Sequence, residues 1–256
     1  MAVQQNYCRQ GPHTQKGHVM KLFLILFGTL CLGSNYLIAE NLIGGKLTDH
    51  FPELIAIRSG QGFCSSTLIG PNTILTAAHC IDKKTKKMRL HSQNINGECE
   101  ISEYYRKHPS LDLALCKLDQ KIILDKYPRL AEANEIPEID DKIVLTGYGC
   151  TKRNSYDWKL RAGYAYITRH VNNTYWARKK SSKQAALCFG DSGGGSFKYM
   201  KNPSKDEHVV MGVNSQGDIE RLSILVSIGS RMAQDFIYDF AKKSGSDICG
   251  ISIQCE

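Results

Sequence analysis

The sequence predicts an all-β protein built as a sandwich or as a pair of barrels. Most of its apolar segments are four to eight residues long, are rich in Val, Ile, Leu, Thr and Tyr, and are bounded by turn-forming residues. This pattern is typical of short strands. A single stretch, 231–243, repeats apolar residues at helical spacing. A chain of 256 residues could form one large domain or two small ones, and all-β barrels of this size commonly count as one domain.

Eight segments are predicted to form strands. In chain order they are 54–57, 66–69, 73–76, 111–118, 143–146, 162–168, 209–213 and 222–228. The predicted helix, 231–243, is followed by Gly245, and glycine commonly terminates helices. The apolar residues that recur along this helix are Met232, Phe236, Ile237 and Phe240.

The composition is that of a globular protein and gives little support for nucleic-acid binding. Hydrophobic residues make up 42% of the sequence and charged residues 23%, which excludes a disordered chain. The net charge of +8 is modest, and basic residues are scattered apart from the run 83–89. Because no aromatic residues interleave with that run, a solvated loop explains it better than a nucleic-acid site does.

The N-terminal extension, 1–41, has the features of a targeting sequence. Met20 and a lysine precede the apolar run 22–33, which ends in small residues, as in a secretory signal peptide. The run is too short for a membrane span, so we expect no stable membrane segment after signal removal. Met20 is an alternative start of the chain, and cleavage after Gly33 or after Ala39 would leave pro-segments of different length. We therefore expect the mature chain to be secreted, in an extracellular or periplasmic compartment.

Eight cysteines remain in the expected mature chain, and they are Cys64, Cys80, Cys99, Cys116, Cys150, Cys188, Cys249 and Cys255. In an oxidising compartment an even number favours four disulfides, although spacing alone leaves many connectivities open. No C-x-x-C pair occurs, and the nearest histidines do not have zinc-ligand spacing. We expect no metal site and no cofactor.

The glycine-rich stretch 187–196 is the most informative segment. Three glycines after Ser192 suit a tight loop that exposes one hydroxyl among backbone N–H groups, although a polar surface turn would contain the same residues. His79 ends a predicted strand, and Asp112 lies in an apolar strand, where an ionised carboxylate needs a hydrogen-bonding partner. We hypothesise that Asp112 orients His79 and that His79 takes a proton from Ser192. Purely structural roles for His79 and Asp112 are the alternative.

The order of these three residues resembles that of the chymotrypsin/trypsin family of serine proteases. The segments T-A-A-H-C, D-L-A-L and G-D-S-G-G match the three catalytic motifs of the family. L-I-G-G matches its activated N-terminus, and T-G-Y-G matches the segment after its interdomain crossing. The resemblance covers the chain from Leu42 to about Lys243.

The resemblance implies an all-β fold of two six-stranded antiparallel β-barrels with the active site between them, plus a C-terminal α-helix. The peptidase domain would span 42–256. Its barrels would lie at about 42–145 and 146–243, followed by a C-terminal tail.

The resemblance also implies a role for each site residue. Ser192 would attack the scissile carbonyl, and His79 would act as general base and then protonate the leaving amine. Asp112 would orient His79 and stabilise its charged form. The backbone N–H groups of Gly190 and Ser192 would form the oxyanion hole.

Activation in this family frees an amino group that pairs with the aspartate before the nucleophile. The matching residues here are Leu42 and Asp191. Asn41 precedes Leu42, whereas trypsin-like zymogens usually carry Lys or Arg at that place. We therefore expect an activating protease of a different specificity.

Disulfide pairing is likewise inferred from the resemblance. The family has a bridge beside its catalytic histidine and a cysteine before its oxyanion loop. The usual partner of the second cysteine is absent here, and Cys150 is the candidate that replaces it. The expected pairs are Cys64–Cys80, Cys150–Cys188, Cys99–Cys116 and Cys249–Cys255.

The family's primary specificity pocket has its base six residues before the nucleophile, which is Ala186, with Leu187 beside it. Ala186 lacks the carboxylate with which trypsin-like enzymes hold Lys or Arg. Leu225 falls near the position at which the family usually has a glycine that keeps the pocket open. The opposite wall corresponds to Ser215, Gln216 and Gly217. We predict a small or shallow apolar pocket that favours uncharged side chains.

These inferences predict a secreted serine endopeptidase that acts through a Ser-His-Asp triad and an acyl-enzyme, cleaving after small or apolar residues. The alternative is a catalytically weak or inactive homologue that acts as a binding protein. An α/β-hydrolase is excluded because its nucleophile elbow requires alternating strands and helices. The expected partners are a protein or peptide substrate and an activating protease, and we expect a monomer that binds no nucleic acid.

Overall fold

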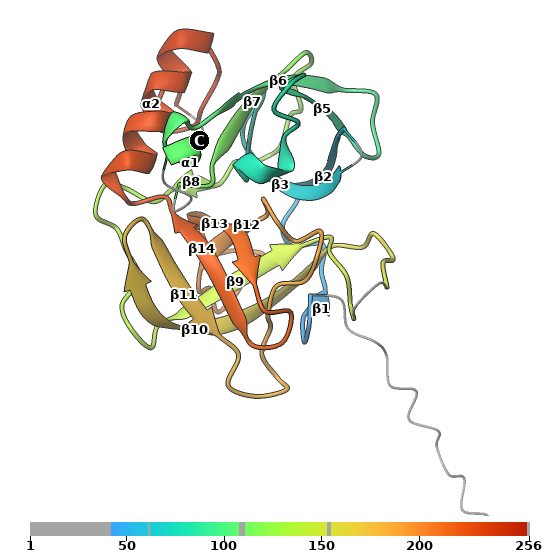
Figure 1. Cartoon of the computed structure of the whole chain (residues 1–256), viewed down its shortest axis with the longest axis vertical. Coiled ribbons are helices and arrows are strands. Elements are labelled where there is room, and N and C mark those ends of the chain that lie inside the picture. The colour runs from blue at the N-terminus through green and yellow to red at the C-terminus, as the bar shows by residue number, and fades with distance from the viewer. Residues whose placement is uncertain (1–41, 61, 108–110, 153–154, 255–256) are drawn as a thin grey trace, which may run out of the picture. The chain divides into compact units, whose positions relative to one another are not determined.

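The computed structural model describes residues 42–60, 62–107, 111–152 and 155–254. All of them belong to the second of the two units, 1–37 and 38–256, into which the chain divides. The signal peptide and pro-segment expected in 1–41 lie outside the described residues. Most of the regular elements of the described chain are strands (Figure 1).

In chain order the elements are β1 (Lys46–Leu47), β2 (Leu54–Ser59), β3 (Gly62–Gly70), β4 (Thr73–Thr76), the 3₁₀ turn η1 (Ala78–Cys80), β5 (Lys87–Leu90), β6 (Asn96–Ile101), α1 (Glu103–Lys107), β7 (Ala114–Leu118), β8 (Arg129–Leu130), β9 (Lys142–Gly147), β10 (Arg161–Val171), β11 (Thr174–Arg178), β12 (Gly195–Lys198), β13 (Val209–Gly217), β14 (Leu222–Ser227) and α2 (Arg231–Ser244).

The first barrel is formed by β2, β3, β4, β7, β6 and β5, paired in this order and closed by the pairing of β5 with β2. All of its pairings are antiparallel. Closure leaves no free sheet edge, so the interior can be filled with side chains. Its fully buried residues include Ile57, Leu68, Leu75, Leu90 and Leu115.

The second barrel is formed by β10, β11, β14, β13, β12 and β9, and the pairing of β9 with β10 closes it. The short strand β1 is added to β10, and β8 pairs with β13 in parallel. In Figure 1 the first barrel is coloured from blue to green and the second mainly from yellow to orange. The predicted fold of two six-stranded antiparallel barrels is confirmed.

Helix α2 agrees with the prediction to within one residue at its C-terminal end. The Ser230 hydroxyl accepts a hydrogen bond from the Ala233 N–H at 3.4 Å and caps the N-terminus, and Gly245 ends the helix with a φ of +58°. The chain then returns to the first barrel, where Lys117 Nζ donates to the Ser244 carbonyl at 2.7 Å. No helix in the described part of the chain is long and apolar enough to span a membrane.

The structure contains several strands that were not predicted, and one predicted strand begins later than expected. Strands β1, β5, β6, β8, β11 and β12 were not predicted. β1 and β8 are only two residues long, and polar residues or glycine interrupt the apolar pattern of the other four. The predicted strand 111–118 begins only at Ala114. Asp112 therefore lies in the segment before β7 rather than within a strand.

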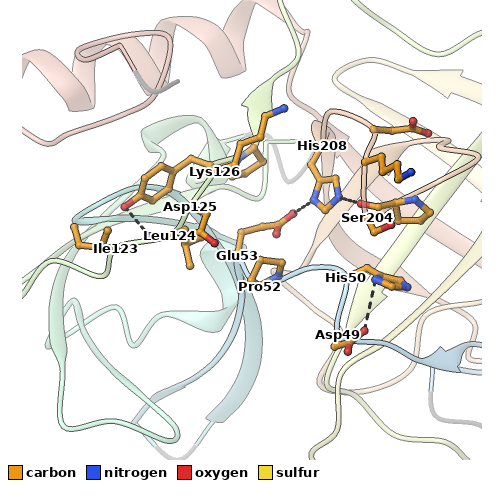
Figure 2. Close-up of a pocket in the computed structure, with 15 residues that line it drawn as sticks. Asp49, His50, Pro52, Glu53, Ile123, Leu124, Asp125, Lys126, Ser204 and His208 are labelled. Atoms are coloured by element: carbon orange, nitrogen blue, oxygen red, sulfur yellow. Dashed lines mark hydrogen bonds and ion pairs between the residues drawn. The ribbon is translucent and has the colours of Figure 1, made fainter.

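A largely buried histidine–carboxylate pair, His208 and Glu53, joins the two barrels and lines a cavity of about 460 Å³ (Figure 2). His208 Nδ1 lies 2.6 Å from Glu53 Oε1, and His208 Nε2 lies 2.7 Å from the Pro203 carbonyl. Burial opposes the charged ring, but the hydrogen bond and charge of Glu53 raise the pKa of His208 above its ordinary value. This pair helps to fix the start of β2 against the segment that precedes β13.

Candidate active site

His79 is presented by a rigid connection at the end of β4. The 3₁₀ turn Ala78–Cys80 follows that strand, and the Cys64–Cys80 disulfide ties the turn to β3. The flanking Ala78 and Cys80 are buried, whereas 35% of the His79 side chain is exposed. The sequence therefore fixes the backbone on both sides of the ring and leaves the ring open to solvent.

Asp112 is 1% exposed, and three donors compensate its burial. The His79 N–H donates to Oδ1 at 2.9 Å, His79 Nδ1 lies 2.6 Å from Oδ2, and the Ser215 hydroxyl donates to Oδ2 at 2.7 Å. An ionised carboxylate can only accept, so Nδ1 of His79 carries the proton. The Nε2 atom is then the basic position of the ring.

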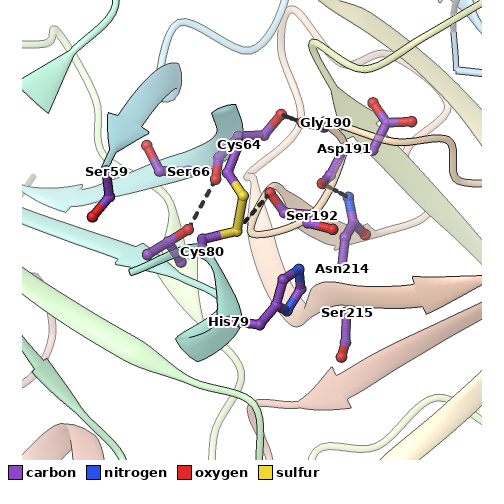
Figure 3. The surroundings of a disulfide bond; sticks show 12 residues. Ser59, Cys64, Ser66, His79, Cys80, Gly190, Asp191, Ser192, Asn214 and Ser215 are labelled. Atoms are coloured by element: carbon purple, nitrogen blue, oxygen red, sulfur yellow. Dashed lines mark hydrogen bonds between the residues drawn. A yellow bond between two sulfur atoms is a disulfide. The ribbon is translucent and has the colours of Figure 1, made fainter. Parts of the chain in front are cut away.

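Ser192 and His79 line the same cleft, which has a volume of about 500 Å³. Figure 3 shows both residues beside the Cys64–Cys80 disulfide. The Ser65 N–H donates to the Ser192 carbonyl at 2.8 Å, which holds the nucleophile segment against β3. No hydrogen bond joins Ser192 Oγ to His79 Nε2 among the described residues, and such bonds are often long or poorly aligned in unliganded enzymes.

The segment before Ser192 is fixed by contacts on both sides of Gly190. The Cys150 N–H donates to the Phe189 carbonyl at 2.8 Å, and the Ser65 hydroxyl donates to the Gly190 carbonyl at 2.8 Å. Because the peptide is trans, the Gly190 N–H points away from Cys150. Within the described part of the chain, neither the Gly190 N–H nor the Ser192 N–H donates to another atom. Both are available to an oxyanion.

Ser65 was not singled out from the sequence. Besides donating to Gly190, its hydroxyl accepts from the Tyr148 N–H at 3.0 Å. It thereby connects a strand of the first barrel to two loops of the second. The only signal in the sequence is a run of small polar residues, Cys64-Ser-Ser-Thr67, inside a strand that proves to be buried.

The comparison with known families agrees with this geometry. Residues 46–237 match the family model described as Trypsin. The chain belongs to the trypsin family. Human granzyme M is 28% identical over 207 residues, which cover 69% of this chain and 80% of granzyme M.

Two solved structures have the same fold, and both are scabies mite inactivated protease paralogues. Paralogue S-I1 has a TM-score of 0.62 at 19% identity, covering 78% of this chain and 99% of its own. Paralogue S-D1 has a TM-score of 0.64 at 18% identity, covering 81% and 100%. At this level of identity the likeness extends to the fold alone.

The two residues expected to pair on activation, Leu42 and Asp191, both contact the segment Gly149-Cys150. Asp191 is fully buried, and its carboxylate accepts from the N–H groups of Gly149 and Cys188, both at 2.8 Å. A Cβ at Gly149 would lie 2.6 Å from Asp191 Oδ1, so this glycine is required by the close approach of the carboxylate. Leu42 is also fully buried, and its N–H donates to the Cys150 carbonyl at 3.2 Å.

Burial dominates the electrostatics of Asp191. It raises the pKa of the carboxyl to about 7, although the N–H groups of Cys188 and Gly149 and the charge of Arg161 act in the opposite direction. Arg161 is itself paired with Asp157 at 2.8 Å. In the uncleaved chain the Leu42 nitrogen is an amide and supplies no positive charge to Asp191.

Three of the four predicted disulfides are present, namely Cys64–Cys80, Cys99–Cys116 and Cys150–Cys188. The replacement partner proposed for Cys188 is thus found in the structure. The fourth predicted pair includes Cys255, which lies outside the described residues. Cys64, His79 and Cys80 are close together, but both sulfur atoms are used in the disulfide and cannot act as thiolate ligands.

The residues of the predicted specificity pocket are near one another, with one change. Ala186 and Leu187 are buried, and a Cβ at Gly217 would lie 3.6 Å from the Leu187 Cβ. Strand register places Ser223, not Leu225, opposite Gly217, and the Ser223 hydroxyl accepts from the Leu187 N–H at 3.1 Å. Leu225 pairs instead with Asn214, so the register of β14 places Ser223 rather than Leu225 beside the predicted wall at Gly217.

The other two wall residues differ in their surroundings. The Ser215 hydroxyl is used on Asp112, so this side chain supports the carboxylate. Gln216 is exposed near the end of β13, where the family commonly has a tryptophan.

Proposed function

We propose that the chain is a secreted serine endopeptidase in which Ser192, His79 and Asp112 hydrolyse peptide bonds. The observation that carries this proposal is the buried Asp112 carboxylate, whose three donors include both the backbone N–H and the ring of His79. This arrangement leaves His79 Nε2 as a base in the cleft that also exposes Ser192. A purely structural histidine would not need an open ring held in this way.

In the proposed reaction Ser192 Oγ attacks the scissile carbonyl carbon while His79 Nε2 takes the hydroxyl proton. The carbonyl oxygen becomes an oxyanion and accepts hydrogen bonds from the N–H groups of Gly190 and Ser192. His79 then gives its proton to the amide nitrogen, the C–N bond breaks, and an acyl-serine ester remains. Water attacks this ester with His79 again as base, which releases the acid and restores the Ser192 hydroxyl.

We propose that the uncleaved chain is a zymogen whose peptidase domain is 42–256, preceded by a signal peptide and pro-segment in 1–41. Cleavage after Asn41 by another protease would give Leu42 an ammonium group beside the Asp191 loop. The fully buried Asp191 and its raised pKa support this idea, since no ion pair to its carboxylate is found among the described residues and the charge of Arg161 does not offset its burial. Such an ion pair would order the loop that carries the oxyanion donors.

We further propose that the primary pocket accepts small or apolar side chains, because Ala186 and Leu187 provide apolar groups and Ser223 offers only a hydroxyl that is already bonded. Gln216 and Gly217 would pair with the substrate backbone at the exposed end of β13.

The proposed partners are a protein or peptide substrate and an activating protease. Both would meet the protein, a monomer, outside the cell or in the periplasm. The disulfides and the relationship to granzyme M support this compartment.

The second candidate function is a binding protein without activity. One observation favours it, namely that Ser192 Oγ has no hydrogen bond to His79 among the described residues. Active-site labelling separates the two candidates. Protein cleaved to begin at Leu42 should react with a fluorophosphonate probe, and the Ser192→Ala variant should not. The cleaved protein should also hydrolyse peptides with Ala, Val, Leu or Phe before the scissile bond faster than peptides with Arg or Lys there. Absence of labelling in the cleaved protein would favour the binding protein.

A further inference from the structure

Three aromatic side chains form a cluster at the rim of the catalytic cleft, and we call Phe63, Tyr156 and Trp158 the aromatic platform. The ring centroids of Phe63 and Trp158 are 4.0 Å apart, and Tyr156 stacks on Trp158 at 5.2 Å with an interplanar angle of 18°. All three line the cleft that contains His79 and Ser192. Tyr156 and Trp158 are still 40% and 39% exposed, so their stacking leaves surface for another ring.

The aromatic platform lies directly beside the loop of the proposed oxyanion donors. A Cβ placed on Gly190 would be 3.6 Å from Phe63 Cδ1 and 3.7 Å from Tyr156 Cε1. A substrate carbonyl held at Gly190 would therefore place its neighbouring residues within reach of these rings.

The platform is on the side of the cleft that receives the leaving group. The residues assigned to the acyl side, Ala186 and Gly217, do not line this cleft, whereas the Cys64–Cys80 disulfide does. His79, which would protonate the leaving amine, lines this cleft, and its partner Asp112 accepts a hydrogen bond from Ser215 of the acyl-side wall. Substrate residues after the scissile bond would thus run along the disulfide toward the platform.

Trp158 is held at this rim in a conformation that bulky residues rarely adopt. Its φ is +58°, in the left-handed region. The preceding Asp157 accepts two hydrogen bonds from Arg161, at 2.9 and 2.8 Å, and Arg161 is only 4% exposed. A buried anchor therefore supports a strained backbone that presents a half-exposed ring, which is the kind of strain that accompanies binding sites.

We propose that the aromatic platform binds an aromatic side chain of the substrate, within the first two residues after the scissile bond. This inference rests on the proposed peptidase function. A cationic side chain fits less well, because the Arg58 guanidinium already lies 5.9 Å from the Phe63 ring centroid. Asp82 also lines the cleft, and hydrogen bonds from the backbone N–H groups of Thr85 and Lys84 lower the pKa of its carboxyl. A basic side chain is therefore the competing occupant, and the Arg peptide tests it. Offset stacking on exposed rings favours an aromatic side chain over an aliphatic one.

The test uses internally quenched peptides that are identical before the scissile bond and carry Phe, Leu, Ala or Arg at the first or the second position after it. With protein cleaved to begin at Leu42, Phe at one of these positions should raise kcat/KM about tenfold over Ala. Tyr156→Ala and Trp158→Asn should reduce this Phe-to-Ala ratio to about one, and asparagine tolerates the left-handed backbone. Tyr238→Ala, which removes a 61% exposed ring from α2, is the matched control and should keep the wild-type ratio.

The outcomes separate this inference from the proposed function. Fluorophosphonate labelling of Ser192 together with a Phe-to-Ala ratio near one, or with fastest cleavage of the Arg peptide, would overturn the aromatic preference alone. Absence of both labelling and hydrolysis would overturn the proposed peptidase. In that case the Ser192→Ala protein is titrated with the Phe and Ala peptides while the fluorescence of its two tryptophans is followed. Equal affinities would then overturn the platform as well.

Discussion

The burial of the Asp191 carboxyl should make the uncleaved chain less stable as the pH rises from about 4 to about 7. Burial raises the pKa of this carboxyl from its ordinary 3.8 to about 7. In that interval the folded chain keeps a proton that the unfolded chain has lost, so the free energy of unfolding falls with pH. Below the interval both states are protonated, and above it both are ionised. Since a pKa change of one corresponds to about 1.4 kcal/mol, the total decrease is on the order of 4 kcal/mol.

The measurement is the urea midpoint of the full, uncleaved chain at a series of pH values, with Ser192→Ala in every sample to prevent self-cleavage. Asp191→Asn in the same background removes the titrating group. Other groups contribute equally to both proteins, including His208, whose raised pKa also lowers stability as the pH rises. The difference between the two curves therefore reports on Asp191. Parallel curves between pH 4 and pH 7 would refute the argument.

Cleavage before Leu42 supplies the complementary result within the same experiment. An ammonium group beside Asp191 would hold the pKa of the carboxyl below its usual range. The stability from that pair would be present above the pKa of the unfolded carboxyl and lost only as the pH falls below it. The decrease between pH 4 and pH 7 should therefore disappear in the cleaved protein. A decrease that persists after cleavage would show that the new amino group does not reach Asp191.

Three further predictions concern the residues that hold the oxyanion loop. Ser65→Ala removes the hydrogen bonds to the Gly190 carbonyl and from the Tyr148 N–H, so it should lower kcat about tenfold in the cleaved protein with little change in KM. Ser65→Thr keeps a hydroxyl and should retain more of the rate. Equal rates for both variants would contradict the role of the hydroxyl. Gly149→Ala should destabilise the chain by about 2–3 kcal/mol in urea unfolding, because its Cβ would collide with Asp191; an unchanged midpoint would contradict this. Replacing Cys150 and Cys188 together by serine should cost about 3–4 kcal/mol, given a separation of 38 residues, and a loss below 1 kcal/mol would show that the bridge is dispensable.

The all-β class was predictable because its signals are local, whereas the arrangement in two six-stranded barrels was implied by the resemblance of the motifs to a known family. Short apolar runs at positions such as 73–76 and 143–146 lie in strands of the structure, and Gly245 ends the helix as expected. The strands that escaped prediction are those whose burial comes from the partner strand. In β6, for example, Asn96–Ile101 alternates charged or polar residues with Gly97, Cys99 and Ile101, and Cys99 is buried through its bridge to Cys116. Such a pattern becomes recognisable only after the pairing is known.

The candidate site was predictable in its side chains but not in its supporting contacts. His79, Asp112 and Ser192 stand in motifs that the sequence displays directly. Ser65 and Ser223 act through hydrogen bonds to backbone groups more than thirty residues away. A serine in a strand carries no sign of which distant carbonyl or N–H it will meet, because strand register and loop position decide that.

The position of the site between the barrels means that neither barrel could assemble it alone. His79 and Asp112 come from the first barrel and Ser192 from the second. The contacts that cross include the Ser215 hydroxyl on Asp112 at 2.7 Å and the Ser65 N–H on the Ser192 carbonyl at 2.8 Å. A relative shift of the barrels would leave buried polar groups unpaired, at about 1–3 kcal/mol for each group. These contacts resist such a shift in the folded chain, so the barrels hold His79, Asp112 and Ser192 in place before a substrate arrives. The proposed cleavage before Leu42 would add an ion pair at Asp191, in the loop that carries the oxyanion donors.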